Sequence, residues 1–173
     1  GLSVGGIVAQ GLSAVRPDLV KGLVLSDTAH RIGPSDMWNQ RIAAIRAGGI
    51  EALAEPILER WFSKRFHAEC PEALAGWRAM LTRTPVEGYL GTCAAIRDAD
   101  LTEAAQAIRV PTLCLVGGED GATPPDLVRS TAELIPGARF EVIEGVGHLP
   151  CVEAAETMTD LVMGFLSETG LDR

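Results

Sequence analysis

Short apolar runs that alternate with helical patterns constrain the fold of this chain more than any other feature. The runs are rich in residues that favour strands, and turn residues follow each of them. They lie at Val20–Ser26, Val110–Val116 and Arg139–Ile143. Apolar residues spaced three and four apart predict helices at Val4–Val15, Pro124–Leu134 and Glu153–Leu166. Because strands that alternate with helices usually pair in parallel, the sequence predicts an α/β fold with a parallel sheet flanked by helices.

The middle of the chain follows a different pattern. No strand-like run occurs between Pro34 and Arg109. Apolar residues there recur at helical spacing, as at Trp38, Ile42 and Ile45. This pattern predicts an inserted helical cap that packs onto the sheet layer. We therefore expect three segments: a core part at 1–33, the helical cap at 34–109 and a second core part at 110–173.

Several helix ends carry local signals. Thr123 can cap the helix that begins near Pro124, and proline suits the first helical position. Thr84 and Glu87 form a capping box, in which the hydroxyl and the carboxylate each accept a free backbone N–H. The pair Gly48–Gly49 is expected to end an earlier helix.

Length and charge limit the possible functions. With 173 residues, 47% of them hydrophobic, the chain can bury one substantial core. Its formal net charge of −8 opposes binding to nucleic acid, since that affinity comes from clustered Lys and Arg. No run of 18 apolar residues could cross a bilayer, and the opening residues do not resemble a secretory signal. We expect a cytoplasmic protein without nucleic-acid or membrane partners.

The cysteines and histidines offer no pattern typical of a metal site. Cys70, Cys93, Cys114 and Cys151 are widely separated and form no C-x-x-C pair. The three histidines have no partner at a spacing suited to zinc. We expect reduced thiols and no bound metal.

The chain opens with GLSVG, which matches the pattern G-x-S-x-G. In a nucleophile elbow of this kind, small flanking residues allow a strained turn from strand to helix that exposes the serine hydroxyl. The pattern alone is weak, because glycine-rich serine turns also serve to bring a helix close to a strand. Ser3 becomes a candidate nucleophile only together with other residues.

Two later residues complete a candidate triad. Asp120 follows the predicted strand that ends at Val116, and His148 follows the strand that ends near Ile143. The chain order Ser, Asp, His is that of the α/β-hydrolases. Singly, Asp120 would be an ordinary turn aspartate and His148 a loop histidine. Their joint occurrence with Ser3 favours a catalytic triad.

Acyl transfer requires these residue types. A serine hydroxyl becomes an effective nucleophile when a base removes its proton, and imidazole titrates near neutral pH. A carboxylate orients the imidazole and stabilises its charged form; we predict Asp120 for this role, with the neighbouring Glu119 as the alternative. The backbone N–H of Val4 is expected to supply one donor to the oxyanion.

The chain begins directly on the serine turn, without Met. We expect an N-terminal portion to lie outside it, with the strand that leads into Gly1 and the loop that supplies the second oxyanion donor. Loss of one such donor typically costs about 10²- to 10³-fold in rate. The run Val20–Ser26 would then form an unpaired sheet edge. We therefore expect this chain by itself to be poorly soluble and nearly inactive.

Longer strings give a more specific resemblance. The chain closely resembles 3-oxoadipate enol-lactonases in DTAHRIG (27–33), MWNQRIAAIRAGGIEALAEPILERWF (37–62) and EGYLGTCAAIRDADL (87–101). The resemblance runs through essentially the whole chain. It implies an α/β-hydrolase fold and hydrolysis of 3-oxoadipate enol-lactone, a step in bacterial degradation of protocatechuate and catechol. It also implies a small anionic substrate and no metal or organic cofactor.

The free carboxylate of such a substrate needs a partner in the pocket. The cap offers Arg31, Arg41, Arg46, Arg60, Arg65 and Arg97, of which we favour Arg41. Trp38 and Trp61 can line an apolar pocket over the lactone ring or belong to the core of the cap, and of the two we favour Trp38 for the pocket. The predicted substrate-binding residues are therefore Trp38 and Arg41.

Two other functions fit the same fold, since a fold alone does not identify a substrate. A carboxylesterase or other small-ester hydrolase would use the same triad, but the segment EGYLGTCAAIRDADL favours the lactonase. A non-catalytic relative would typically have lost a triad residue, and Ser3, Asp120 and His148 are all present.

Overall fold

The sheet is the centre of the molecule. A computed structural model describes residues 1–172. Its strands form one sheet in the order β1-β2-β3, and both pairings are parallel. The strands are β1 (Leu23–Ser26), β2 (Thr112–Gly117) and β3 (Arg139–Ile143). The predicted α/β fold, a parallel sheet flanked by helices, is confirmed.

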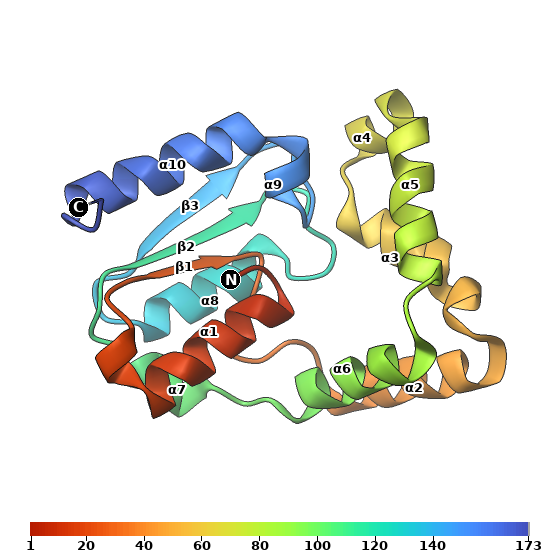
Figure 1. The fold of residues 1–173 in the computed structure, drawn as a ribbon, viewed down its shortest axis with the longest axis horizontal. Coiled ribbons are helices and arrows are strands. Elements are labelled where there is room, and N and C mark those ends of the chain that lie inside the picture. The colour runs from red at the N-terminus through yellow and green to blue at the C-terminus, as the bar shows by residue number, and fades with distance from the viewer. Residues whose placement is uncertain (173) are drawn as a thin grey trace.

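The helices account for most of the remaining chain (Figure 1). The α-helices within residues 1–172 are α1 (Val4–Val15), α2 (Ser35–Gly48), α3 (Ala54–Trp61), α4 (Lys64–Glu69), α5 (Pro71–Thr82), α6 (Val86–Asp98), α7 (Thr102–Ala107), α8 (Pro125–Leu134), α9 (Pro150–Glu153) and α10 (Ala155–Glu168). Short 3₁₀ helices lie at Pro17–Leu19 and Ile50–Leu53. No helix in this described part of the chain has the length and apolar character that a bilayer crossing needs.

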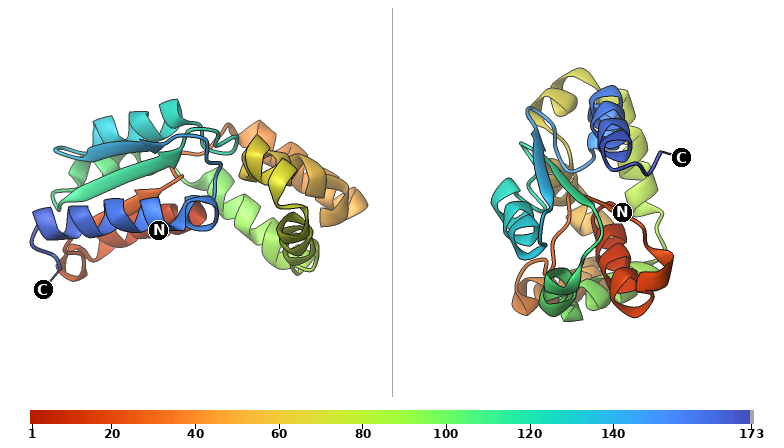
Figure 2. Two further views of the ribbon diagram at one scale, coloured as in Figure 1. Left: turned by 90° about the horizontal axis from the view of Figure 1, so that it is seen from above. Right: turned by 90° about the vertical axis from the view of Figure 1, so that its left-hand side faces the viewer.

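Helices cover both faces of the sheet (Figure 2). Side chains alternate along β2, and every residue of that strand is buried. Leu113 and Leu115 pack with Phe165 of α10 on one face. Cys114 packs on the other face, with Val128 of α8. A strand buried on both faces accounts for the continuous apolar run that marked it in the sequence.

Helices α2 to α6 stand beside the sheet, on the side toward which the strands point (Figure 1). Trp38, Ile42 and Ile45 are buried together in their core, as the helical spacing predicts. Ala29 and Ile32, which follow β1, belong to the same core. The helical part therefore packs directly against the end of the sheet where strands give way to loops.

Helix α7 packs with the sheet layer instead. Its Ala105 is buried with Ile108 and with the strand residues Leu23 and Cys114. It also contacts α1 and α8. The division at 34–109 remains a proposal, and the helices that pack as a cap are α2 to α6.

Element ends differ from the sequence predictions where turns intervene. β1 begins at Leu23 rather than Val20, because a 3₁₀ helix and a bend at Lys21 precede it. β2 begins at Thr112, after Pro111, which has no N–H to donate to the sheet. The predicted C-terminal helix is divided into α9 and α10 at Ala154, whose φ of −146° is not helical.

The prediction of a capping box at Thr84 and Glu87 is wrong. α6 begins at Val86 after Pro85, and neither a hydroxyl nor a carboxylate caps it. The Thr84 hydroxyl instead donates to Met80 O at 3.1 Å, one turn back in α5. The predicted end of α2 is confirmed, since Gly49 has a φ of 73°, a conformation that glycine adopts without strain.

Candidate active site

Ser3 lies in a strained turn at the start of α1. Its φ of 53° and ψ of −120° are unfavourable for a residue with a side chain. The preceding residues run parallel to β1: Ser3 N–H donates to Ser26 O at 3.0 Å, and Ser26 N–H donates to Gly1 O at 3.0 Å. A strand-like segment that turns sharply into a helix is the geometry that G-x-S-x-G predicts for an exposed hydroxyl.

Close packing explains the small residue at position 6. A Cβ on Gly6 would lie 2.3 Å from Cγ2 of Thr28. Thr28 is fully buried, and its hydroxyl donates to Ser3 O at 2.6 Å. Gly5 differs, because within the described residues an added Cβ there would meet nothing closer than 4 Å. The turn also needs a residue without Cβ at Gly1, where an added Cβ would lie 2.3 Å from Gly5 O.

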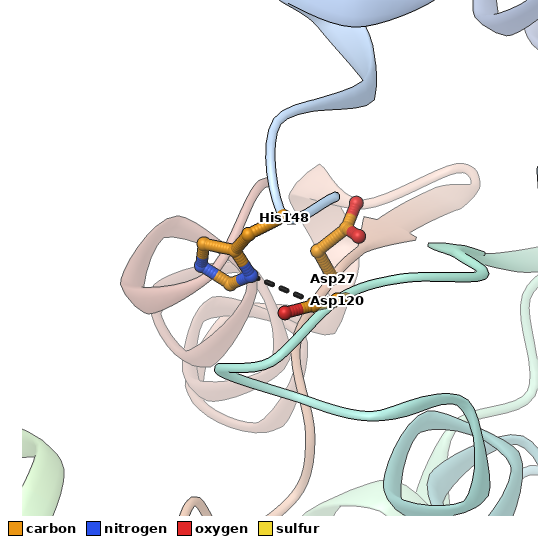
Figure 3. Close-up of side chains that lie close together, drawn as sticks. All are labelled: Asp27, Asp120 and His148. Carbon is orange, nitrogen blue, oxygen red and sulfur yellow. Dashed lines mark hydrogen bonds and ion pairs between the residues drawn. The ribbon is translucent and has the colours of Figure 1, made fainter. Parts of the chain in front are cut away.

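Asp120 and His148 come from the loops after β2 and β3 and meet at one edge of the sheet (Figure 3). His148 Nδ1 lies 2.8 Å from Asp120 Oδ2, and each residue is only 3% exposed. Glu119 points elsewhere: it is exposed, and its carboxylate accepts the Lys64 N–H at 3.1 Å. The structure thus brings Asp120 rather than Glu119 to the histidine.

The surroundings of Asp120 keep it anionic. Its Oδ1 accepts the N–H groups of Ala122 (2.7 Å) and Thr123 (2.9 Å), and its Oδ2 accepts the Thr123 hydroxyl (2.7 Å). Burial acts to raise the pKa of Asp120, but the hydrogen bond and charge of His148 and the bonds from Thr123 outweigh it and lower the pKa. Because a carboxylate only accepts, the bonded His148 Nδ1 carries the proton.

Thr123 therefore does not cap α8, and that prediction is wrong. The helix begins at Pro125, and no side chain caps it. The Thr123 hydroxyl is committed to Asp120 and is also 3.4 Å from His148 Nδ1. The sequence predicted that Thr123 caps a helix because a proline follows it. In the structure its hydroxyl instead donates to Asp120, in the loop before the helix.

Ser3, Val4 and His148 line one cavity of about 170 Å³. The Val4 N–H stands at the first position of α1, where no carbonyl of the same helix can accept it. Within residues 1–172 this N–H forms no hydrogen bond, and none joins Ser3 Oγ to His148. Catalytic hydrogen bonds are often long in unliganded enzymes. The cavity brings together the proposed nucleophile, base and oxyanion donor.

Two of the six candidate arginines line this cavity, Arg41 and Arg60. Arg41 Cζ lies 4.9 Å from the ring centroid of Trp38, which also lines the cavity. Trp38 is held in place by a 2.6 Å hydrogen bond from Nε1 to Ile32 O. The pKa of Arg60 is lowered mainly by burial and, to a smaller extent, by the positive charge of Arg41. The cavity therefore contains concentrated positive charge beside an aromatic wall.

The remaining arginines do not line the cavity. Arg31 pairs with Asp100, and Arg97 pairs with Asp98. Arg46 and Arg65 are exposed. Sequence reasoning also missed cavity residues on α6, namely Tyr89, Thr92, Cys93 and Ile96. Their spacing of three and four along one helix face was the signal that could have found them.

Comparison with known proteins decides the family. The alpha/beta hydrolase family matches residues 1–161. The chain belongs to this family. Among proteins similar to this alpha/beta hydrolase is 3-oxoadipate enol-lactonase 1 of Acinetobacter baylyi, which is 30% identical over 166 residues, 96% of this chain and 62% of that protein.

Solved structures give the same result. The enol-lactonase from Burkholderia xenovorans LB400 has 36% sequence identity and a TM-score of 0.91, over 96% of this chain and 64% of that one. A thermophilic esterase from Thermogutta terrifontis has 30% identity and a TM-score of 0.88, over 98% of this chain and 64% of that one. The resemblance to enol-lactonases is confirmed. The chain spans less than two thirds of the length of each of these relatives.

Asp27 is a second buried acid beside the Asp120–His148 pair of this alpha/beta hydrolase, and sequence reasoning missed it (Figure 3). It follows β1 with a φ of 48°, and its Oδ1 accepts the Gly117 N–H at 2.9 Å. The Ser26 hydroxyl donates to its Oδ2 at 2.5 Å. Burial and, to a smaller extent, the charge of Asp120 raise the pKa of Asp27 to about 8, against the opposing effect of these hydrogen bonds.

The same three residues are the candidates for a metal site. One ligand atom each from Asp27, Asp120 and His148 lies within 4.8 Å of the others. The Asp120 oxygens already accept four donors, one of them from His148 Nδ1, and a metal would have to displace them. The donor set suits a hydrogen-bonded acid and base, and it does not fit a metal.

Replacement of Asp27 by Asn is expected to raise thermal stability, and increasingly so at high pH. The pKa of Asp27 rises from 3.8 to about 8, so between those values the folded protein binds a proton that the unfolded chain has released. The stability of the wild type therefore falls as pH rises through that window. Asn needs no such proton and tolerates a positive φ.

Thermal unfolding of both proteins from pH 4 to pH 9 tests this. The gain in Tm from Asp27→Asn is expected to be small near pH 4 and to exceed about 3 °C above pH 8, roughly 1 kcal/mol for a chain of this size. Asp160→Asn, at an exposed position of α10, is the control and should show no such trend. A gain that does not depend on pH would contradict the interpretation.

Proposed function

We propose that this alpha/beta hydrolase opens 3-oxoadipate enol-lactone to 3-oxoadipate through an acyl-enzyme. The proposal is carried by one cavity lined by Ser3 and His148 and also by Arg41 and Arg60. A hydroxyl beside a base suits acyl transfer, and guanidinium groups suit the free carboxylate of a small lactone. Similarity to the two enol-lactonases supports the same substrate.

In the proposed reaction, Ser3 Oγ attacks the lactone carbonyl carbon and His148 Nε2 accepts the hydroxyl proton. Asp120 holds the opposite ring nitrogen and stabilises the imidazolium. The Val4 N–H donates to the oxyanion. The bond from the carbonyl carbon to the ring oxygen then breaks, and the proton on His148 Nε2 passes to the leaving enolate oxygen, so that the resulting enol becomes the ketone and His148 is again neutral. His148 then takes a proton from water, whose oxygen attacks the acyl carbon, and the same proton goes to Ser3 Oγ as its bond to the acyl carbon breaks.

The test compares two substrates, the enol-lactone and an aryl acetate, with the protein as its gene encodes it. A preference of at least about 10-fold in kcat/KM for the lactone is expected, since a charged hydrogen bond contributes roughly 1.5–3 kcal/mol. Ester turnover without lactone turnover would favour a carboxylesterase or other small-ester hydrolase, and the Thermogutta terrifontis relative is described as an esterase. Absence of both activities would favour a non-catalytic relative.

Arg41 is expected to select the anionic substrate. Arg41→Leu should raise KM for the enol-lactone about 10- to 100-fold, because the substrate carboxylate loses a charged partner. Its kcat/KM for the neutral aryl acetate should change less than about threefold, because that ester has no carboxylate to pair. Steady-state kinetics with both substrates measure the difference.

Arg46→Leu is the matched control, because Arg46 lies on the same helix, is exposed and does not line the cavity. An equal loss for both substrates in Arg41→Leu would contradict a role in carboxylate recognition. Such a result would indicate damage to the pocket as a whole.

A further inference from the structure

The C-terminal end of α3 contacts both loops that carry the proposed acid and base, Asp120 and His148. Trp61 O accepts the His148 N–H at 2.8 Å, and Arg60 O accepts the Gly121 N–H at 3.1 Å, next to Asp120. The side chains of Arg60 and Trp61 line the cavity. One short segment therefore borders the substrate space and holds the loops that position acid and base.

Glu153, the last residue of α9, completes this contact. Its Oε1 accepts the Gly147 N–H at 3.0 Å and the Ser63 N–H at 3.1 Å, and its Oε2 accepts the Ser63 hydroxyl. Gly147 directly precedes His148, and Ser63 lies two residues after Trp61, the last residue of α3, whose carbonyl accepts the His148 N–H. A single carboxylate thus joins the histidine loop to the cap, across 90 residues of sequence.

Packing around this carboxylate is tight. A Cβ on Gly147 would lie 2.6 Å from Trp61 O and 2.8 Å from Glu153 Oε1, so only glycine fits there. Ser63 is 1% exposed, and its hydroxyl oxygen also accepts the Phe66 N–H at 3.2 Å to cap α4. The histidine loop at Gly147 is therefore packed directly against the end of α3 and against Glu153.

We propose that Glu153 is a positioning residue that sets the location of the His148 imidazole. It acts by fixing Gly147 and Ser63 to one carboxylate, which locks the histidine loop to the segment that borders the substrate. Glu153 does not line the cavity, so it acts through His148. This inference rests on the proposed function, in which His148 is the base.

Glu153→Ala tests the inference in the protein as its gene encodes it. The substitution is expected to lower kcat about 10- to 100-fold, because a displacement near 1 Å at a catalytic group costs about that much. KM should stay within about threefold, since the cavity lining is unchanged. The NMR signal of the His148 Nδ1 proton should shift or broaden, as its distance to Asp120 is no longer fixed.

Glu153→Gln should restore kcat to within about threefold of the wild type, because its amide oxygen can still accept both N–H groups and its NH₂ can donate to the Ser63 hydroxyl. Glu156→Ala, an exposed acid on α10, should leave kcat unchanged. Phe165→Leu, in the core under α10, is a control for stability alone. Phe165→Leu should lower Tm, and its kcat should equal that of the wild type at temperatures below its unfolding transition.

A lower Tm with unchanged kcat and Nδ1 signal in Glu153→Ala would overturn the proposal, since Glu153 would then only stabilise the fold. An equal loss of kcat in Phe165→Leu would overturn it as well. Ser3→Ala separates the two ideas. Full activity of Ser3→Ala contradicts the proposed function, whereas an inactive Ser3→Ala beside a fully active Glu153→Ala contradicts this inference alone.

Discussion

Ser3→Ala is expected to lower the rate of hydrolysis at saturating substrate by about 10⁴-fold or more, because loss of the nucleophile removes the acyl-enzyme route. Residual turnover would come from the oxyanion donor and from binding. The strained turn that holds Ser3 should persist, since Ala has a similar shape and the backbone bonds to Ser26 and Thr28 remain. Affinity for the substrate should change little.

Two measurements check this prediction. Initial rates give kcat, and mass spectrometry after treatment with a fluorophosphonate reports covalent labelling, which should occur on the wild type and not on Ser3→Ala. Ser13→Ala lies on the same helix, outside the cavity, and is the matched control. A loss in Ser3→Ala of less than about tenfold would be too small for a missing nucleophile and would contradict the role of Ser3.

Asp120→Asn is expected to lower kcat about 10⁴-fold, as in the Ser-His-Asp enzymes, where the change leaves the geometry intact but reverses the histidine tautomer. The amide oxygen can replace Oδ1, which accepts the N–H groups of Ala122 and Thr123. The amide NH₂ then faces His148 Nδ1 and donates to it. The proton moves to Nε2, which can no longer accept one from Ser3.

Asp27→Asn is the matched control for this substitution. Both aspartates are buried, and both lie within reach of His148. Because the raised pKa makes Asp27 neutral at pH 7, its replacement by a neutral amide should change kcat at that pH by less than about threefold. A large loss in Asp27→Asn with a small one in Asp120→Asn would transfer the role of the acid to Asp27.

The predictions that succeeded rest on short-range patterns. The run at Arg139–Ile143 and the helix at Val4–Val15 have the predicted ends, because a side-chain period of two or of 3.6 is encoded in neighbouring residues. The predicted ends of strands and helices were wrong where a turn or a proline interrupts the side-chain period, as at Pro111 before β2. Thr84 and Thr123 failed as caps because a hydroxyl bonds to whichever acceptor the fold brings nearest.

Three features could be predicted from the residues alone: the alternation of strands and helices, the elbow around Ser3, and the chain order of serine, acid and histidine. These features are local or follow from the rule that parallel strands end at one edge of a sheet. Other features became visible in the folded molecule: His148 meets Asp120 rather than Glu119, Arg41 and Arg60 line the cavity, and Asp27 and Glu153 lie close to the histidine loop. The reason is physical: each of those choices depends on contacts between segments tens of residues apart, whose approach is set by packing of the whole core and not by the neighbours of any one residue.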